Sequence, residues 1–250
     1  MIPYFEVPPF EVFGLLIHPF GLLTALGTIF GYMIAVREAR RRGLPDGYID
    51  KVALTAVACG IVGSAIGDTL FYRPGDFIAD PLASLDFTKH MSSTSGFLFG
   101  SVAGLITVWL LRGPFLLSAM VIYVGVAHGW VLARLGCTVA HDHPGTLSNF
   151  PLAVKFPLGA RHDLGFYEFL FTVALVTFLN MINRDRLAPG KVLLLIAVPY
   201  CLFRFMADFL RVGDTQYLGL TPAQYFCLAV LGGIAGVLIR QFTGGRAYTN

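Results

Sequence analysis

One stretch decides how this chain folds, Gly129-Trp-Val-Leu-Ala-Arg-Leu-Gly-Cys-Thr-Val-Ala-His-Asp-His-Pro-Gly145. An apolar segment from residue 115 to residue 135 leads into it and is long enough to cross a membrane as a helix. Near the end of that segment, the guanidinium of Arg134 must snorkel, pair with a carboxylate or hold an anion. Pro144 and Gly145 then force a turn. A fixed cation beside titratable groups at a membrane boundary predicts chemistry on an anionic lipid.

The composition of the whole chain favours a membrane protein. Of the 250 residues, 56% are hydrophobic and 13% are charged, whereas soluble domains carry about 25% charged residues. The net charge of +3 is small and the chain has no basic tract, so we expect no nucleic-acid partner. The first residues lack a basic region, so we expect no cleavable signal peptide.

Seven segments are long and apolar enough, or nearly so, to form spanning helices. The third is short and rich in Gly and Ser, which predicts close packing inside the bundle rather than contact with lipid. The predicted fold class is all-α: a polytopic membrane bundle of about seven transmembrane helices in a single integral membrane domain, 1–250. Two outward-facing loops are expected to cover one end of the bundle. They are an arm at about 73–95 and a head at about 136–165. The seven segments lie near 17–36, 52–72, 96–111, 115–135, 166–182, 192–210 and 222–241.

The distribution of basic residues predicts the orientation of the bundle. With the N-terminus outside, the inner loops and helix ends carry eleven of the 18 Lys and Arg residues, which is the positive-inside sign. All six histidines then fall on the outer half. We therefore expect the chemistry to face outward.

The end of the sixth segment carries charged residues on one helix face. Arg204 and Asp208 are four residues apart, and Arg211 follows three residues later. One interpretation is a paired Arg and Asp that lets charge sit in a membrane helix. The other is an arginine oriented by Asp208 and free to bind a phosphate with two hydrogen bonds. A second arginine is not needed to neutralise one Asp, which favours the phosphate site.

Other polar residues have two interpretations each. Glu168, which follows Tyr167 at the start of the fifth segment, either complements the helix dipole or helps Tyr167 to orient an arginine of the central stretch. Asp68 needs a partner inside the membrane, and we expect an outer arginine. His18 is either an interfacial residue without a role or part of the site. Ser95 is a candidate nucleophile, although no G-x-S-x-G elbow surrounds it.

The four cysteines do not form a disulfide framework. Three lie inside apolar segments and are expected to be small buried hydrophobes, whereas Cys137 could line the site as a thiol. His141 and His143 could bind a metal, but such a site needs three or four ligands with suitable spacing. We therefore predict no metal site.

The central stretch resembles the signature of prolipoprotein diacylglyceryl transferase, a family of bacterial membrane enzymes that start lipoprotein maturation. In that signature Arg, Leu and Gly follow one another, and an acidic residue and a closing Gly come later. Arg134, Gly136, Asp142 and Gly145 fit it in register. The resemblance covers nearly the whole chain in order, with the seven-helix topology of the family. It extends to His18-Pro-Phe-Gly21, Asp80-Pro81, His162, Tyr167-Glu168 and the run from Tyr200 to Arg211.

Two departures mark the chain as a divergent member. Family members often have Asn where this chain has Cys137, and a His-Gly-Gly run where it has Ser95-Gly-Phe. That family His is considered important for catalysis. We therefore expect the base to be His141, His143 or His162, or the chain to act on a different acceptor.

The resemblance implies transfer of a diacylglyceryl group from phosphatidylglycerol to the lipobox cysteine thiol of a prolipoprotein, with release of glycerol phosphate. A histidine would deprotonate the thiol, and Arg134 and Arg204 would stabilise charge on the phosphate. The implied partners are phosphatidylglycerol, membrane lipid and the prolipoprotein signal peptide, with no metal or organic cofactor. The implied location is the bacterial cytoplasmic (inner) membrane, with the active site on the periplasmic side, and we expect a monomer.

Two alternatives stay open. The chain could be a lipid-binding or transport protein that kept the arginines without the chemistry, or a transferase that uses phosphatidylglycerol with another acceptor. Candidate catalytic residues are Arg134, Arg204, His141, His143 and His162. Candidate substrate-binding residues are Arg134, Arg204, Arg211, Asp142, Gly145, Cys137, Ser95, Tyr167, Glu168, Asp208 and His18.

Overall fold

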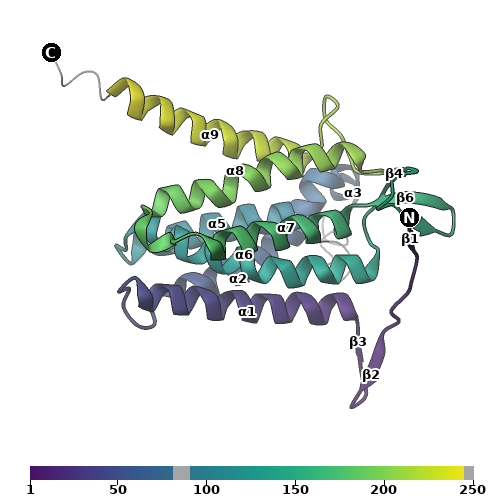
Figure 1. Ribbon diagram of the computed structural model, residues 1–250, viewed down its shortest axis with the longest axis horizontal. Coiled ribbons are helices and arrows are strands. Elements are labelled where there is room, and N and C mark those ends of the chain that lie inside the picture. The colour runs from purple at the N-terminus through teal and green to yellow at the C-terminus, as the bar shows by residue number, and fades with distance from the viewer. Residues whose placement is uncertain (81–90, 245–250) are drawn as a thin grey trace.

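The computed structural model describes residues 1–80 and 91–244 of the chain. Within them, seven helices are long and apolar enough to cross a membrane, and consecutive ones run in opposite directions (Figure 1). The predicted all-α, multi-pass membrane bundle is therefore confirmed. The helices are α1 (Pro19–Arg41), α2 (Tyr48–Tyr72), α5 (Ser93–Leu110), α6 (Phe115–Ala140), α7 (Leu164–Met181), α8 (Pro189–Ala207) and α9 (Pro222–Gly244).

Local signals begin and end these helices. Pro19 and Pro189 stand in the first turns of α1 and α8, where a missing N–H costs nothing. The side chain of Asp163 accepts a hydrogen bond from the Phe166 N–H and so caps α7. His141, in the left-handed conformation, ends α6.

Small residues let the helices of two pairs approach closely. A Cβ added to Gly27 of α1 would lie 2.5 Å from the Gly129 carbonyl oxygen of α6. A Cβ added to Gly100 of α5 would lie 2.8 Å from the Ala56 carbonyl oxygen of α2. The close packing predicted for the third segment is confirmed on this face. The opposite face of α5 carries exposed side chains such as Trp109, so its expected separation from lipid is wrong.

The apolar core fills one half of the bundle. Met120, Val121 and Val124 of α6 are fully buried against Leu179 of α7 and Val192 of α8. These residues lie toward the end of the bundle where α7 ends and α8 begins, which we call the opposite end. The polar side chains described below lie toward the other end, where α6 ends and α7 begins, which we call the head end.

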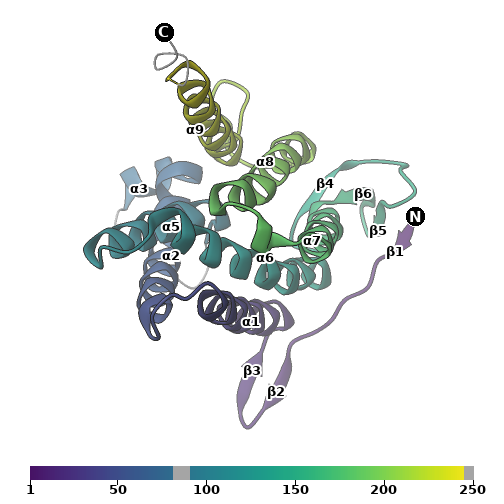
Figure 2. The ribbon, with the colours of Figure 1, turned by 60° about the vertical axis from the view of Figure 1, so that its left-hand side comes forward.

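The head end carries a small sheet that the sequence analysis did not predict (Figure 1). Its strand order is β1-β5-β6-β4, and β1 joins it in parallel with β5. A separate hairpin, β2 (Phe10–Val12) and β3 (Leu15–Ile17), extends away from the bundle before α1 (Figure 2). The four strands of the sheet are β1 (Ile2–Pro3), β4 (Pro144–Leu147), β5 (Val154–Phe156) and β6 (Gly159–Asp163).

Two expected boundaries differ in the structure. Residues 136–140 belong to the last turns of α6 rather than to the head, because Gly136 and Cys137 pack against α1 and α7. The arm begins with a short helix, α3 (Pro74–Ala79). Residues 81–90, which include Pro81 of the family resemblance and His90, lie outside the described residues.

Candidate active site at the head end of the bundle

A buried carboxylate on α7 joins α6 and α8. Glu168 is 2% exposed. Its Oε1 lies 2.9 Å from Nε of Arg134, and its Oε2 accepts a 2.9 Å hydrogen bond from Nη1 of Arg204. The hydroxyl of Tyr200 and the indole N–H of Trp130 also donate to Oε1, at 2.7 and 3.2 Å. The structure thus brings together the two arginines predicted to bind phosphate, and Glu168 holds both.

Arg134 is fixed by its own helix as well as by Glu168. Trp130, Arg134 and Cys137 are spaced four and three residues apart, so their side chains share a face of α6. The guanidinium carbon lies 4.3 Å from the centre of the Trp130 ring, and Nη1 donates to Cys137 Sγ at 3.4 Å. Its Nη2 has no hydrogen bond or ion pair with any residue that the structure describes. This nitrogen is therefore available to a ligand.

The Arg204, Asp208 and Arg211 group has the predicted shared face. Nη2 of Arg204 lies 3.0 Å from Oδ1 of Asp208, and Asp208 also accepts a hydrogen bond from the Thr221 hydroxyl. Nη1 of Arg211 is 3.8 Å from Asp208, and its Nε is 2.9 Å from Asp214. Burial, together with the nearby Arg204, lowers the pKa of Arg211. An anion beside Arg211 would favour its charged form.

Gly145 brings the head against the segment that carries Arg211. The two residues form an isolated antiparallel bridge. A Cβ on Gly145 would lie 2.7 Å from the Leu210 carbonyl oxygen, closer than real Cβ contacts allow. Nη1 of Arg161 donates to the Gly145 carbonyl at 3.0 Å. The closing glycine of the central stretch therefore permits a close approach that holds Arg211 in place.

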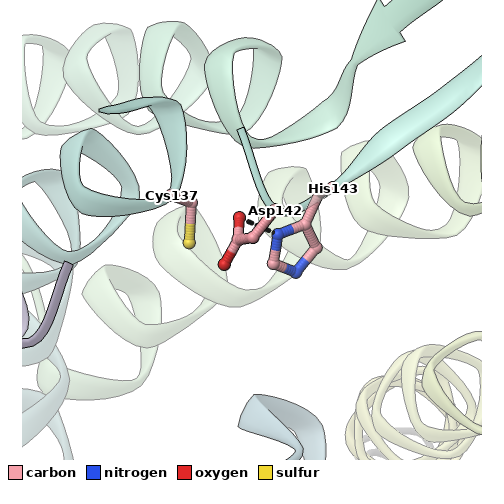
Figure 3. Close-up of side chains that lie close together, drawn as sticks. All are labelled: Cys137, Asp142 and His143. Carbon is pink, nitrogen blue, oxygen red and sulfur yellow. Dashed lines mark hydrogen bonds and ion pairs between the residues drawn. The ribbon is translucent and has the colours of Figure 1, made fainter. Parts of the chain in front are cut away.

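The histidines of the central stretch face different surroundings. His143 hydrogen-bonds the carboxylate of Asp142, and both lie close to Cys137 (Figure 3). Ligand atoms of these three residues all lie within 4.8 Å of one another. His141 is buried instead: its Nδ1 is 2.5 Å from Oδ2 of Asp163, with the rings of Tyr4 and Phe5 packed against it. The structure thus places His143, and not His141, on the side of Cys137 and Arg134.

His162 lies in β6 and pairs with the first turn of α7. Its Nδ1 lies 2.9 Å from the hydroxyl of Tyr167. Burial lowers the pKa of His162, so the neutral imidazole is favoured at neutral pH. The expectation that Tyr167 orients an arginine is not met, because this hydroxyl faces His162 while Glu168 contacts the arginines.

Other predicted residues lie apart from Glu168. Ser95 is buried where α5 packs against Gly67 of α2, and His18 is exposed at the start of α1. No contact between described residues joins either to the arginines. Asp68 pairs with Nε of Arg73 at 2.9 Å, which confirms the predicted partner of this carboxylate. His128 bonds Asn180 near the opposite end of α7, so not all histidines gather at the head end.

Three residues that contribute contacts to the site are absent from the set predicted from the sequence. Trp130 lies four residues before Arg134, and Tyr200 lies four residues before Arg204. Because residues four apart share a helix face, this spacing could have identified both. Asp163 contacts His141 from 22 residues away. No local pattern predicts that contact, although Asp before a helix is a familiar N-cap.

Seven helices that are long and apolar enough to cross a membrane, with a buried arginine–carboxylate–arginine group toward one end, define a multi-pass membrane protein. The sequence matches the model of the prolipoprotein diacylglyceryl transferase family over residues 9–240. The chain therefore belongs to that family and is a transferase.

Named relatives agree with this assignment. A phosphatidylglycerol–prolipoprotein diacylglyceryl transferase of Mannheimia succiniciproducens is 30% identical over 225 residues, which cover 87% of this chain and 84% of the relative. One of Pseudomonas aeruginosa is 30% identical over 258 residues and covers 94% of each chain. One of Haemophilus influenzae is 27% identical, over 91% of this chain and 88% of the relative.

Proposed function

We propose that this chain transfers a diacylglyceryl group from phosphatidylglycerol to the lipobox cysteine thiol of a prolipoprotein and releases glycerol phosphate. The observation that carries the proposal is the bridge that Glu168 forms between Arg134 and Arg204. It holds two cations in one place at the head end, where a phospholipid headgroup can lie. The names of the relatives supply the two substrates.

The arginines act on the phosphate. When the bond between the glyceryl carbon and its phosphate oxygen breaks, the electron pair moves to that oxygen, and the phosphate charge changes from about −1 to about −2. Nη2 of Arg134 and the guanidinium of Arg211 are the donors that we assign to this phosphate. Arg204 was also expected to bind it, but both of its Nη atoms lie against Glu168 and Asp208, so we assign it the positioning of these carboxylates. Because they are held before the reaction, they stabilise the added charge without reorganisation, and one such donor contributes about 3 kcal/mol.

His143 takes the proton from the acceptor thiol. The sulfur forms a bond to the glyceryl carbon as the bond to the phosphate oxygen breaks, and the thiol proton moves to the imidazole. Of the three candidate histidines, His143 is the one clustered with Cys137, whose sulfur accepts a hydrogen bond from Arg134. Asp142 orients the ring through its hydrogen bond. We assign His162 no proton transfer, because its described polar contact is to Tyr167.

The proposal includes a location and an assembly state. We place the protein in the bacterial cytoplasmic (inner) membrane with the head end on the periplasmic side. The basic residues support this orientation, since Arg37, Arg40, Arg41, Arg112 and Arg184 all lie at the opposite end. We propose activity as a monomer, because one chain supplies Glu168 and both of the arginines that it contacts.

A rescue experiment tests the proposal. Cells depleted of their own transferase would express this chain, and lipidation of a reporter lipoprotein would be followed by its mass. We expect wild type to restore lipidation, and Arg134→Ala and Arg204→Ala to abolish it while still inserting in the membrane. Arg42→Ala, which removes an arginine at the opposite end, is the matched control and should still rescue. Full rescue by both head-end variants would contradict the phosphate site.

A second experiment defines the donor lipid. Purified protein would be mixed with a lipobox peptide and vesicles of either phosphatidylglycerol or phosphatidylethanolamine. We expect the peptide to gain one diacylglyceryl group only with phosphatidylglycerol, and glycerol phosphate to appear in equal amount. Glycerol phosphate release without a lipidated peptide would show another acceptor and reject the proposed one.

A further inference from the structure

Three potential metal ligands converge where α6 ends. Cys137 stands in the last turn of the helix, and Asp142 and His143 follow the left-handed residue that ends it. That reversal folds the next two side chains back toward the sulfur (Figure 3). Among the residues that the structure describes, this is the only group of three or more Cys, His, Asp or Glu side chains whose ligand atoms lie within 4.8 Å of one another.

The donor set has the chemistry of a zinc site. Thiolate sulfur, imidazole nitrogen and carboxylate oxygen are the three atom types that bind Zn²⁺ in proteins, at about 2.0–2.3 Å. In a tetrahedral site such bonds place ligands about 3.4–3.7 Å apart. The ligand atoms here all lie within 4.8 Å of one another, so the widest gap exceeds this spacing by about 1 Å at most. Small rotations of Asp142 and His143, whose side chains are 35% and 21% exposed, can close it.

The charges of the cluster match a divalent cation. Zn²⁺ bound by the Cys137 thiolate and the Asp142 carboxylate gives no net charge, and the proton of the thiol leaves to solvent. Arg134 donates to Cys137 and remains a cation, because Glu168 supplies one negative charge to both Arg134 and Arg204. The metal can lie beside this arginine because its two anionic ligands cancel its charge.

The cluster is buried on the side of Cys137 and open to solvent on the side of Asp142 and His143. Cys137 is 4% exposed, and in Figure 3 the Asp142 carboxylate lies between its sulfur and the His143 ring. Asp163 holds His141 away from the cluster. The fourth position of a bound metal would face solvent, as in zinc sites that keep an open position.

We propose that Cys137, Asp142 and His143 form a Zn²⁺ site, and that bound zinc inhibits the transferase. The inhibitory part rests on the proposed function, because zinc takes the imidazole lone pair that would accept the thiol proton. Zinc binding itself does not depend on the reaction. Zinc thus acts as a reversible inhibitor that binds beside Arg134, one of the proposed phosphate donors.

Binding is tested with the metal alone. Full-length protein, purified in detergent under reducing conditions and stripped with a chelator, would be titrated with Zn²⁺ by calorimetry and with Co²⁺ by absorbance. We expect one Zn²⁺ per chain and a thiolate-to-cobalt charge-transfer band. Cys137→Ser should abolish the band, and Cys137→Ser and His143→Gln should each weaken zinc binding at least tenfold. Cys59→Ser is the matched control and should bind as wild type does; it removes a thiol of α2 that is exposed, and not buried as the sequence led us to expect.

Equal zinc affinity in wild type and Cys137→Ser, or no cobalt–thiolate band in wild type, would overturn the site. The inhibitory part is tested by transferase assays in buffered free zinc. Wild type should lose activity in proportion to occupancy and regain it with chelator, and whatever activity Cys137→Ser has without zinc should be unchanged at the same zinc concentration. Occupancy without inhibition would reject that part. Zinc binding by a chain that never lipidates a peptide would instead contradict the proposed function alone.

Discussion

Two buried glutamates lie at opposite ends of the bundle, and each holds arginines. Glu168 on α7 does so at the head end. Glu38 on α1 is 3% exposed and contacts Arg41 and Arg42 at 3.2 and 3.1 Å, at the opposite end. By residue type and burial the two clusters resemble each other, so composition alone does not separate a binding site from a structural one.

The difference lies in what else the arginines contact. At the opposite end, Nη2 of Arg42 donates to the Arg184 carbonyl at 2.9 Å, and Nη1 of Arg184 donates to the Leu179 carbonyl at 2.7 Å. These bonds tie the ends of α1 and α7 together. At the head end Arg134 contacts only side chains, and its Nη2 has no partner among the described residues. Donors bound to backbone stabilise the fold, whereas free donors beside a shared carboxylate can bind an anion.

The largest effect should come from replacing the two glutamates in turn. Glu168→Gln leaves two buried arginines without their shared charge, which costs about 3–5 kcal/mol of stability. Transfer should fall by about 10³-fold or more per folded molecule. Glu38→Gln removes the matching charge among more exposed arginines. We expect it to lower stability by about 1–3 kcal/mol and to leave transfer within a few fold. Lipidation of a peptide and the thermal midpoint of each purified variant would be measured.

Glu168→Asp provides a second variant if Glu168→Gln does not fold. It keeps the charge, but the shorter side chain cannot reach both arginines, so we expect a folded protein with at least tenfold slower transfer. Equal losses of transfer in the Glu168 and Glu38 variants would remove the functional distinction between the two ends.

The second largest effect should come from replacing two histidines, one in the proposed site and one buried inside the bundle. His143→Gln should slow transfer by about 10²-fold or more, because a general base contributes about 10²–10⁴. His128 is bonded to the Val124 carbonyl and to Asn180. Its replacement by Gln should lower the thermal midpoint and leave the rate per folded molecule nearly unchanged. If His143→Gln transfers as fast as wild type, the base lies elsewhere.

Much of the fold follows from the sequence because the length of an apolar segment is a local property. All seven helices appear near their expected positions. Helix α1 continues past residue 36 to Arg41, since Glu38 pairs with the arginines that follow it. The strands of the head were not predicted, because β1 pairs with a strand about 150 residues later and each strand is too short to show a period.

The contacts of the candidate site also divide into those that the sequence predicts and those that depend on the tertiary structure. The shared face of Arg204 and Asp208 follows from helical spacing. That Glu168 holds both arginines depends on which helices are neighbours, and the sequence left it as one of two interpretations. The separation of His143 from His141 depends on Asp163 and on the reversal at residue 141. Neither is visible in a pattern of neighbouring residues.

An effect of intermediate size should distinguish two glycine-to-alanine substitutions, one at each end of the bundle. Gly145→Ala places a methyl group against the Leu210 carbonyl and displaces Arg211. We therefore expect the KM for phosphatidylglycerol to rise about tenfold, with a smaller change in the rate at saturating lipid. Gly113→Ala overlaps the ring of Tyr48 at the opposite end, where the Tyr48 hydroxyl bonds Ser118. It should lower the thermal midpoint alone. Rates measured against lipid concentration would show the split, and an unchanged lipid dependence in Gly145→Ala would contradict the role given to this contact.

The smallest effect is a pH dependence confined to the head end. Because burial lowers the folded-state pKa of His162, the unfolded chain binds more protons between that value and about 6.5. The contribution of this group is therefore full above about pH 6.5 and is lost as the pH falls through the folded-state pKa. We expect the thermal midpoint of wild type to fall between pH 7.5 and 5, and His162→Gln to reduce that fall slightly. Glu38→Gln should leave the slope near pH 6 unchanged. A steeper fall in His162→Gln would mean that protonation of His162 stabilises the head, the reverse of what its burial implies.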